Sequence, residues 1–487
     1  MSMDSPPRAP ERLSTGCKGL DRVLGGGLFQ GQVYVIAGAP GSGKTILANQ
    51  MAYAAARRGE KVLYVTLMAE SHAQILWQLS GFSFFDPALT GTQVRYLNAY
   101  VQLETSLEAL RDLLRESVRQ SKASLLVLDG VVSAELRARS ETEYKRFVQD
   151  LQSWCGMVGC AAVLLTSAGA DEATRPEYTM VDGVVLLQAV PAGMRRVRQV
   201  RVCKLRGSAF LEGDHCYDIT PDGVGVYPRL EALLRAPSRS HESTSVTTGV
   251  PGLDALTDGG VESDSTTMVL GSSGSGKTIV GMQFLVAGAR LGERCLHFGF
   301  YEDEAALARK GERLGLGWTK LVRDGNIRIV WQPAAEHHID KLADRLLDHV
   351  TAIDARRVVI DGLVGFKNAA VEPGRLGPFF TVLSNELRAR KVTTIITDET
   401  KDLLVRRAHS PTGGLSALCE NIVFLCQVEA RGEVERLLSV LKVRCSGHTR
   451  RFHRVEVAAG GLRVLGPVPG DGSFSVTQPN VEADPEG

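Results

Sequence analysis

The chain has 487 residues, 44% hydrophobic and 23% charged, with a formal net charge of +1. This balance is typical of a globular protein with several domains, and it disfavours attachment to nucleic acid or to an anionic membrane by bulk charge. Nine cysteines lack metal-ligand spacing. We find no secretion signal and no apolar run long enough for a membrane helix, so we expect a cytoplasmic protein without a membrane contact.

Two segments of the chain repeat each other. Ser14–Gly31 reads STGCKGLDRVLGGGLFQG, and Thr247–Gly260 reads TTGVPGLDALTDGG. Their glycines Gly16 and Gly249 lie 233 positions apart (249 − 16). A repeat of this length predicts two similar domains.

Each repeat is followed by a glycine-rich loop that fits G-x-x-x-x-G-K-[ST]. The loops read GAPGSGKT and GSSGSGKT, and their lysines are again 233 positions apart (277 − 44). Such a loop curls backbone N–H groups around a β-phosphate, its lysine reaches the β- and γ-phosphates, and its threonine ligates Mg²⁺. We therefore predict two ATP sites with Mg²⁺. The predicted nucleotide-binding residues are Gly38, Gly41, Ser42, Gly43, Lys44, Thr45, Gly271, Gly274, Ser275, Gly276, Lys277 and Thr278.

The pattern TG-x-x-x-LD-x-x-x-x-GG before a P-loop resembles the RecA-like ATPases of the KaiC type and is shared with RadA/Sms-type proteins. Two tandem copies over nearly the whole chain resemble the KaiC family specifically. The segments that we expect are a flexible arm (1–13), a first ATPase domain (14–234), a linker (235–246), a second ATPase domain (247–465) and a disordered acidic tail (466–487).

One glutamate follows the next predicted strand in each half, Glu70 and Glu302. The resemblance implies that such a glutamate polarises the attacking water. KaiC-type proteins usually carry two adjacent glutamates, whereas Ala69 and Tyr301 occupy the preceding positions here. We therefore expect either slow ATP hydrolysis or shifted roles for Glu70 and Glu302. The alternative is that both are only N-terminal helix charges.

Apolar strands over 123–129 and 357–361 end in Asp129 and Asp361. A carboxylate at the end of a strand beside the P-loop strand can hold the hydration shell of Mg²⁺. We predict that Asp129 and Asp361, with Thr45 and Thr278, form the metal sites.

Strands and helices alternate through each half, which predicts a mainly parallel sheet flanked by helices, followed by a C-terminal β-hairpin region. The predicted fold class is α/β, with two tandem RecA-like P-loop domains. The hairpins carry the pairs Lys204/Arg206 and Lys442/Arg444. These K-x-R pairs resemble the KaiC-type element that reaches a neighbouring subunit's γ-phosphate. The alternative is a solvated basic strand.

Sites completed by a neighbour require a closed ring, and the resemblance implies a hexamer. The resemblance also points to a phosphorylation segment at 414–420, where Ser416 is retained but Ala417 stands in place of a threonine. A two-site phosphorylation cycle is therefore not expected, because alanine offers no hydroxyl. Ser416 as a single phosphosite, with Glu302 as base, remains a hypothesis beside the alternative of a helix-cap serine.

Three functions stay open at this point. The first is a KaiC-like ATPase with serine/threonine autokinase activity, acting as a signalling or timing switch through an unknown regulatory protein. The second is a RecA/RadA-type DNA-dependent ATPase. Neutral charge and the absence of a basic-aromatic track make nucleic acid the less favoured partner. The third is a ring that binds ATP as a scaffold.

Overall fold

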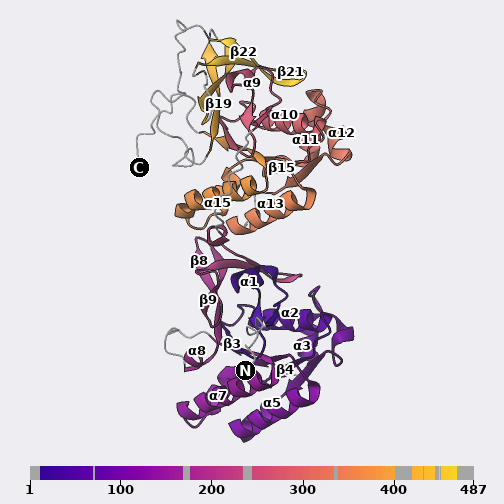
Figure 1. Cartoon of the computed structure of the whole chain (residues 1–487), viewed down its shortest axis with the longest axis vertical. Helices are drawn as coiled ribbons and strands as arrows, with labels where there is room; N and C mark the ends of the chain where they lie inside the picture. The colour runs from indigo at the N-terminus through magenta and orange to yellow at the C-terminus, as the bar shows by residue number, and fades with distance from the viewer. Residues whose placement is uncertain are drawn as a thin grey trace, which may run out of the picture. The chain divides into compact units, whose positions relative to one another are not determined.

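The computed structural model describes residues 11–69, 72–167, 176–233, 244–333, 338–400, 419–430, 433–444, 449 and 451–468. The chain divides into two compact units, Met1–Leu233 and Leu234–Gly487. Each unit is described by itself (Figure 1).

The first unit is built around a nine-stranded sheet in the order β11-β10-β9-β8-β3-β7-β6-β4-β5. The six strands from β8 to β5 are parallel to one another, and β8 to β11 pair antiparallel. The strands of this unit are β1 (Arg12–Leu13), β2 (Leu28–Phe29), β3 (Val33–Gly38), β4 (Val62–Thr66), β5 (Val94–Asn98), β6 (Leu125–Asp129), β7 (Ala161–Thr166), β8 (Gly183–Ala192), β9 (Arg195–Leu205), β10 (His215–Thr220) and β11 (Gly223–Tyr227). Its helices are α1 (Lys18–Val23), α2 (Lys44–Arg57), α3 (His72–Leu79), α4 (Tyr100–Thr105), α5 (Leu107–Ser121), α6 (Val131–Arg137), α7 (Glu141–Val158) and α8 (Pro176–Met180).

The second unit has the same strand order, β22-β21-β20-β19-β14-β18-β17-β15-β16, with the same parallel and antiparallel parts. Its strands are β12 (Ser245–Val246), β13 (Val261–Glu262), β14 (Thr266–Gly271), β15 (Cys295–Gly299), β16 (Ile327–Trp331), β17 (Arg357–Asp361), β18 (Thr393–Glu399), β19 (Asn421–Ala430), β20 (Glu433–Lys442), β21 (His453–Ala458) and β22 (Gly461–Pro467). Its helices are α9 (Leu253–Leu256), α10 (Lys277–Arg290), α11 (Glu304–Arg313), α12 (Trp318–Arg323), α13 (Ile339–Ile353), α14 (Val364–Ala369) and α15 (Leu376–Ala389). The predicted fold class, two RecA-like α/β domains in tandem, is confirmed.

Helices bury both faces of the central strands. In β3 every residue is buried, and successive side chains enter different cores because they alternate across the sheet. Tyr34 and Ile36 pack in the core that includes α2, whereas Val33 and Val35 pack in the core that includes α5 and α7. Such double coverage explains why the strand reads as a continuous apolar run.

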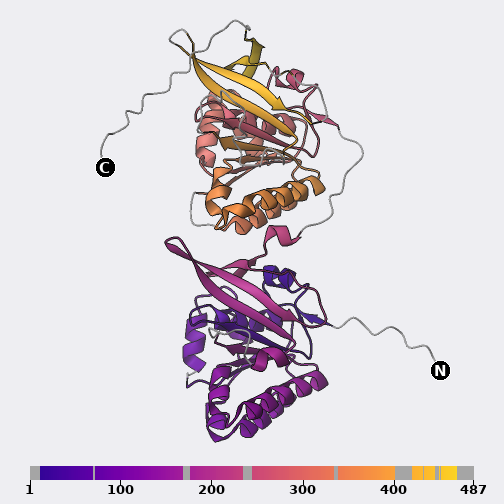
Figure 2. The same ribbon diagram turned by 90° about the vertical axis from the view of Figure 1, so that its left-hand side faces the viewer.

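Each unit has a long β-hairpin. Strand β8 continues to Ala192 through Pro191, and the β8–β9 and β19–β20 hairpins stand out as long twisted ribbons (Figure 2). The pairing of β8 with β3 ends at Leu187. Beyond that residue no strand of the described part of the chain pairs with this side of β8, so a proline without an N–H group is tolerated there.

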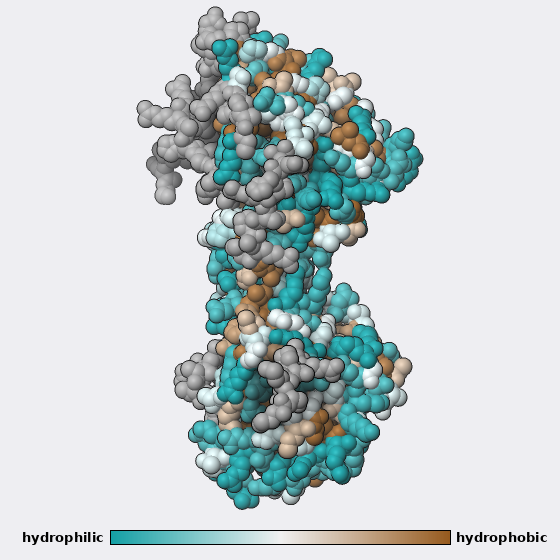
Figure 3. All heavy atoms as spheres, viewed as in Figure 1, coloured by the Kyte–Doolittle hydropathy of each residue, from teal (hydrophilic) through white to brown (hydrophobic). Residues whose placement is uncertain are grey.

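The face seen in Figure 3 is mainly hydrophilic over both units, with apolar groups between the polar ones. Some large apolar side chains are nevertheless exposed, including Trp77 and Leu136. Within the described ranges, no helix combines the length and the apolar character that a membrane span requires.

Candidate nucleotide sites

Both predicted P-loops connect a central strand to a helix. Gly38 and Gly271 end β3 and β14, and α2 and α10 begin at Lys44 and Lys277. Gly43 and Gly276 adopt left-handed backbone conformations, with φ of 93° and 109°, as the residues that cap these helices. A side chain would be strained there, so glycine is required for the loop to close onto the helix N-terminus. Gly41 and Gly274 also have positive φ.

The P-loop lysines fold back over their loops. Lys44 Nζ donates to the carbonyl oxygens of Gly38 (2.7 Å) and Ala39 (3.1 Å), and Lys277 Nζ donates to those of Gly271 (2.8 Å) and Ser272 (2.7 Å). Burial lowers the pKa of both lysines, although nearby carboxylates oppose the shift. Because each lysine ammonium group is partly desolvated, an anionic phosphate ligand would stabilise its charged form.

The P-loop serines also indicate a site for a phosphate ligand. The hydroxyl oxygens of Ser42 and Ser275 are buried and have no hydrogen-bond partner among the described residues. Buried polar atoms are normally satisfied, so these hydroxyls fit a site that receives a polar ligand such as a phosphate.

The first predicted metal site brings Thr45 and Asp129 together. Thr45 Oγ1 donates to Asp129 Oδ2 at 3.1 Å, and the hydroxyl of Tyr64 donates to the same oxygen at 2.8 Å. Burial raises the pKa of Asp129, although the hydrogen bonds from Tyr64 and Thr45 and the charge of Lys44 oppose that rise. The hydroxyl–carboxylate pair is a donor set that suits Mg²⁺.

The second predicted metal site has different neighbours. Thr397 Oγ1 donates to Asp361 Oδ1 at 2.6 Å, and His297 Nε2 lies 3.6 Å from Oδ2. Burial alone would raise the pKa of Asp361, but His297, Thr397 and Thr278 outweigh it and the pKa is lowered. Tyr64 and His297 occupy the same position, the middle residue of the strand that pairs with the aspartate strand.

A cavity of about 470 Å³ opens at the second P-loop. Lys277, Thr278 and Asp361 line it together with Glu302. Glu302 forms an ion pair with Lys310 of α11, which lines the same cavity. The other candidate base, Glu70, and the candidate phosphosite Ser416 lie outside the described residues.

Sequence reasoning missed the acidic end of β18. Asp398 and Glu399 line the second cavity, and Lys367 Nζ donates to Asp398 Oδ2 at 2.7 Å. The corresponding strand β7 ends in Thr166. The Asp-Glu pair that directly follows the β-branched run 392–397 was the available signal, because the C-terminal ends of parallel strands face the ligand in α/β sheets.

The K-x-R pairs lie at the other end of the sheet. Lys204 Nζ donates to the carbonyl oxygens of Tyr178 (3.1 Å) and Thr179 (2.9 Å), and Arg206 Nη2 donates to that of Thr179 (3.4 Å). Strand β9 ends at Leu205, so Lys204 lies in the strand and Arg206 lies just beyond it. Both cations contact the carbonyl group of Thr179.

In the second unit, Lys442 Nζ donates to the carbonyl oxygen of Cys419 at 2.7 Å, and Arg444 Nη1 lies 3.5 Å from Glu420 Oε1. Glu420 also accepts from the backbone N–H of Thr266, the first residue of β14. The P-loop follows Gly271 at the far end of this strand, roughly 17 Å away at the usual rise per residue. Each K-x-R pair is thus remote from the P-loop of its own unit.

Fold and site together define a protein with two tandem P-loop domains of the RecA-like class. The sequence model of the KaiC ATPase family matches residues 13–231 and 246–468. The chain therefore belongs to the KaiC family of ATPases, and the resemblance seen in the sequence is confirmed.

Individual relatives are similar over almost the whole chain. The circadian clock oscillator protein KaiC of Picosynechococcus sp. is 25% identical over 467 residues, which cover 93% of this chain and 89% of the relative. KaiC of Parathermosynechococcus lividus is 26% identical over 94% of this chain and 86% of its own length. The circadian clock protein KaiC3 of Synechocystis sp. is 25% identical, with 94% and 92% covered.

Proposed function

We propose that this chain is a ring-forming ATPase that binds Mg-ATP at both P-loops and hydrolyses it with help from a neighbouring subunit. The proposed ring is a hexamer in the cytoplasm, and we propose that it acts as a signalling or timing switch through a regulatory protein. Family membership supports the ATPase class. The geometry of the sites supports ATP sites to which two subunits contribute residues.

Each P-loop would hold the phosphates of ATP through its backbone N–H groups, its lysine and its serine hydroxyl. Thr45 and Asp129 in the first unit, and Thr278 and Asp361 in the second, would hold Mg²⁺ directly or through water. Mg²⁺ supplies charge neutralisation at the β- and γ-phosphates when bound. Glu302 lines the second cavity and is the proposed base there, as Glu70 is in the first.

One observation carries the proposal of shared sites. In each unit the arginine of the K-x-R pair faces an acid that is hydrogen-bonded to the first residue of the P-loop strand, and the P-loop lies at the other end of that strand. A cation held there cannot serve its own γ-phosphate, but a head-to-tail ring brings it to the next subunit's P-loop. Lys204, Arg206, Lys442 and Arg444 are therefore proposed to act across the interface.

Mixed rings test this arrangement. Neither Lys277→Ala nor Arg444→Ala subunits should hydrolyse ATP at the second site when assembled separately. Mixing them should restore part of the activity, because some interfaces then pair an intact P-loop with an intact arginine. Subunit exchange is checked with two fluorescent labels. Proven exchange without recovery would contradict action across the interface, and the same test applies to Lys44→Ala with Arg206→Ala.

Autophosphorylation is the finer part of the proposal. A serine hydroxyl is a sufficient acceptor for phosphoryl transfer, and Ser416 is the proposed acceptor with Glu302 as its base. Intact-mass and peptide analysis after incubation with Mg-ATP tests it. Phosphate on Ser416 that disappears in Lys277→Ala supports the switch, whereas unmodified Ser416 with continuing hydrolysis leaves a ring ATPase without kinase activity.

A further inference from the structure

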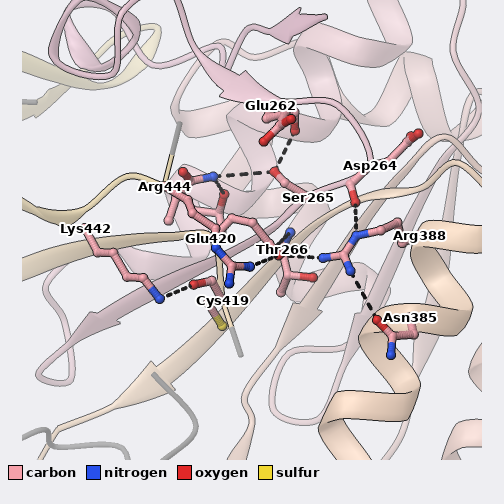
Figure 4. A network of polar contacts seen from close by, with 12 residues as sticks. Glu262, Asp264, Ser265, Thr266, Asn385, Arg388, Cys419, Glu420, Lys442 and Arg444 are labelled. Carbon is pink, nitrogen blue, oxygen red and sulfur yellow. Dashed lines mark hydrogen bonds and ion pairs between the residues drawn. The ribbon is translucent and has the colours of Figure 1, made fainter. Parts of the chain in front are cut away.

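The two cations of the second K-x-R pair are anchored to consecutive residues, Cys419 and Glu420, directly before β19 (Figure 4). Lys442 donates to the backbone carbonyl group of Cys419, whereas Arg444 faces the carboxylate of Glu420. The carboxylate of Glu420 is therefore the side chain that can control where the arginine points.

Glu420 connects three elements of its unit. Its Oε2 accepts from the backbone N–H of Thr266 at 2.9 Å, where the P-loop strand β14 begins. Its Oε1 accepts from Arg388 Nη2 of α15 at 2.5 Å and faces Arg444 Nη1 at 3.5 Å. The Glu420 side chain is only 9% exposed, whereas that of Arg444 is 59% exposed. The acid is thus held by contacts in the protein interior, whereas the arginine is largely exposed.

The first unit repeats this arrangement with different residues. Asp182 Oδ2 accepts from the backbone N–H of Val33, where β3 begins, at 3.0 Å. Its Oδ1 accepts from Gln152 Nε2 of α7 at 2.9 Å and lies 3.7 Å from Arg206 Nη1. The acid and its helix partner both differ between the units, yet the contacts to the P-loop strand and to the arginine are kept.

We infer that Asp182 and Glu420 are positioning residues for the arginines that act on the neighbouring ATP, and that they tie each arginine to the P-loop strand of its own subunit. This inference rests on the proposed action across the interface. The acid contacts both the P-loop strand and the arginine of its own subunit. A displacement of that strand can therefore move the arginine that acts at the next subunit's site. The chemical class of ligand for the positioned arginine is the γ-phosphate of a nucleoside triphosphate.

The strength of the contact suits this role. A largely exposed guanidinium gains little from one ion pair, and Arg388 shares the same Oε1 atom. The pair restricts the directions that Arg444 samples without competing strongly with a polyanionic phosphate. Removing the charge of Glu420 should therefore reduce the fraction of aligned arginine and leave the arginine itself in place.

The experiment uses full-length chains carrying Lys44→Ala, so that the second site is measured alone. Glu420→Gln should lower kcat for ATP by about three- to ten-fold with little change in KM, as expected for an interaction made mainly in the transition state. Glu420→Asp keeps the charge that the first unit uses and should recover part of kcat. The matched control is Glu386→Gln, which breaks another ion pair of a buried glutamate, with Arg390, in which neither K-x-R cation takes part.

Mixing separates positioning from a structural role. Glu420→Gln subunits mixed with Lys277→Ala subunits should regain activity, because the latter donate a properly held arginine to an intact P-loop. An unchanged kcat in Glu420→Gln overturns the inference, as does a loss that this mixing cannot repair while the Arg444→Ala and Lys277→Ala mixture recovers. If that second mixture fails as well, the proposed action across the interface is what has failed.

Discussion

The two nucleotide sites share a backbone plan but differ in the residues around their metal-binding aspartates. Asp129 accepts a hydrogen bond from the neutral hydroxyl of Tyr64, and burial raises its pKa. Asp361 lies beside His297 and accepts from Thr397, and its pKa is lowered. The second site also has Asp398 at its strand end. The same loop can thus be placed in different electrostatic surroundings without changing the fold.

The largest expected effect comes from removing the P-loop lysines. Lys44→Ala and Lys277→Ala should each abolish one class of ATP site, with losses of about 100-fold or more, because the charge at the γ-phosphate disappears. Titration calorimetry of bound nucleotide per chain and phosphate release measure this. Lys320→Ala, on an exposed part of α12, is the control. Unchanged stoichiometry in the double variant would show that the P-loops do not carry the nucleotide.

In Mg²⁺-free protein, removing the charge of Asp129 and removing that of Asp361 should change the free energy of unfolding in opposite directions. Because the pKa of Asp129 is raised, its ionised form costs stability at pH 7, and Asp129→Asn should increase the free energy of unfolding by up to about 1 kcal/mol. The lowered pKa of Asp361 means that its charge stabilises the fold, so Asp361→Asn should cost about 1 to 3 kcal/mol.

Calorimetric unfolding between pH 4 and pH 8 measures both changes. The gain from Asp129→Asn should shrink as the pH falls, because Asp129 itself then becomes protonated. The stabilisation by Asp361 should persist until the pH falls below the usual aspartate range, about 4. Changes of the same sign in both variants would contradict the difference between the two sites.

The smallest expected effect belongs to Tyr64. Tyr64→Phe removes one hydrogen bond to Asp129 and keeps the ring, so Mg²⁺ affinity at the first site should fall by about five-fold, the effect of roughly 1 kcal/mol. The measurement is Mg²⁺ titration of nucleotide-loaded protein carrying Lys277→Ala. Tyr53→Phe, which loses hydrogen bonds with Thr90 and Tyr96 instead, is the matched control. An equal fall of Mg²⁺ affinity in the control would contradict a specific role of Tyr64.

The P-loops, the aspartate strands and the tandem α/β fold could be predicted because each is a local pattern of residues. Tyr64 and His297 could not, since both stand inside buried strands and meet the aspartates only through strand pairing. The same holds for Glu420, which directly precedes β19, and Arg388 of α15, which the fold brings together. Sequence spacing does not reveal which strands become neighbours after a crossover.

Pro191 has a consequence for how the protein behaves at high concentration. Past Leu187 none of the described strands pairs with the outer edge of β8, and an unpaired edge is a template for pairing with another chain. Proline interrupts that edge in the first unit. The corresponding stretch of β19, from Cys426 to Ala430, contains no proline. Aggregation through exposed strands should therefore begin at the second hairpin, where the exposed Val434 lies on the paired strand.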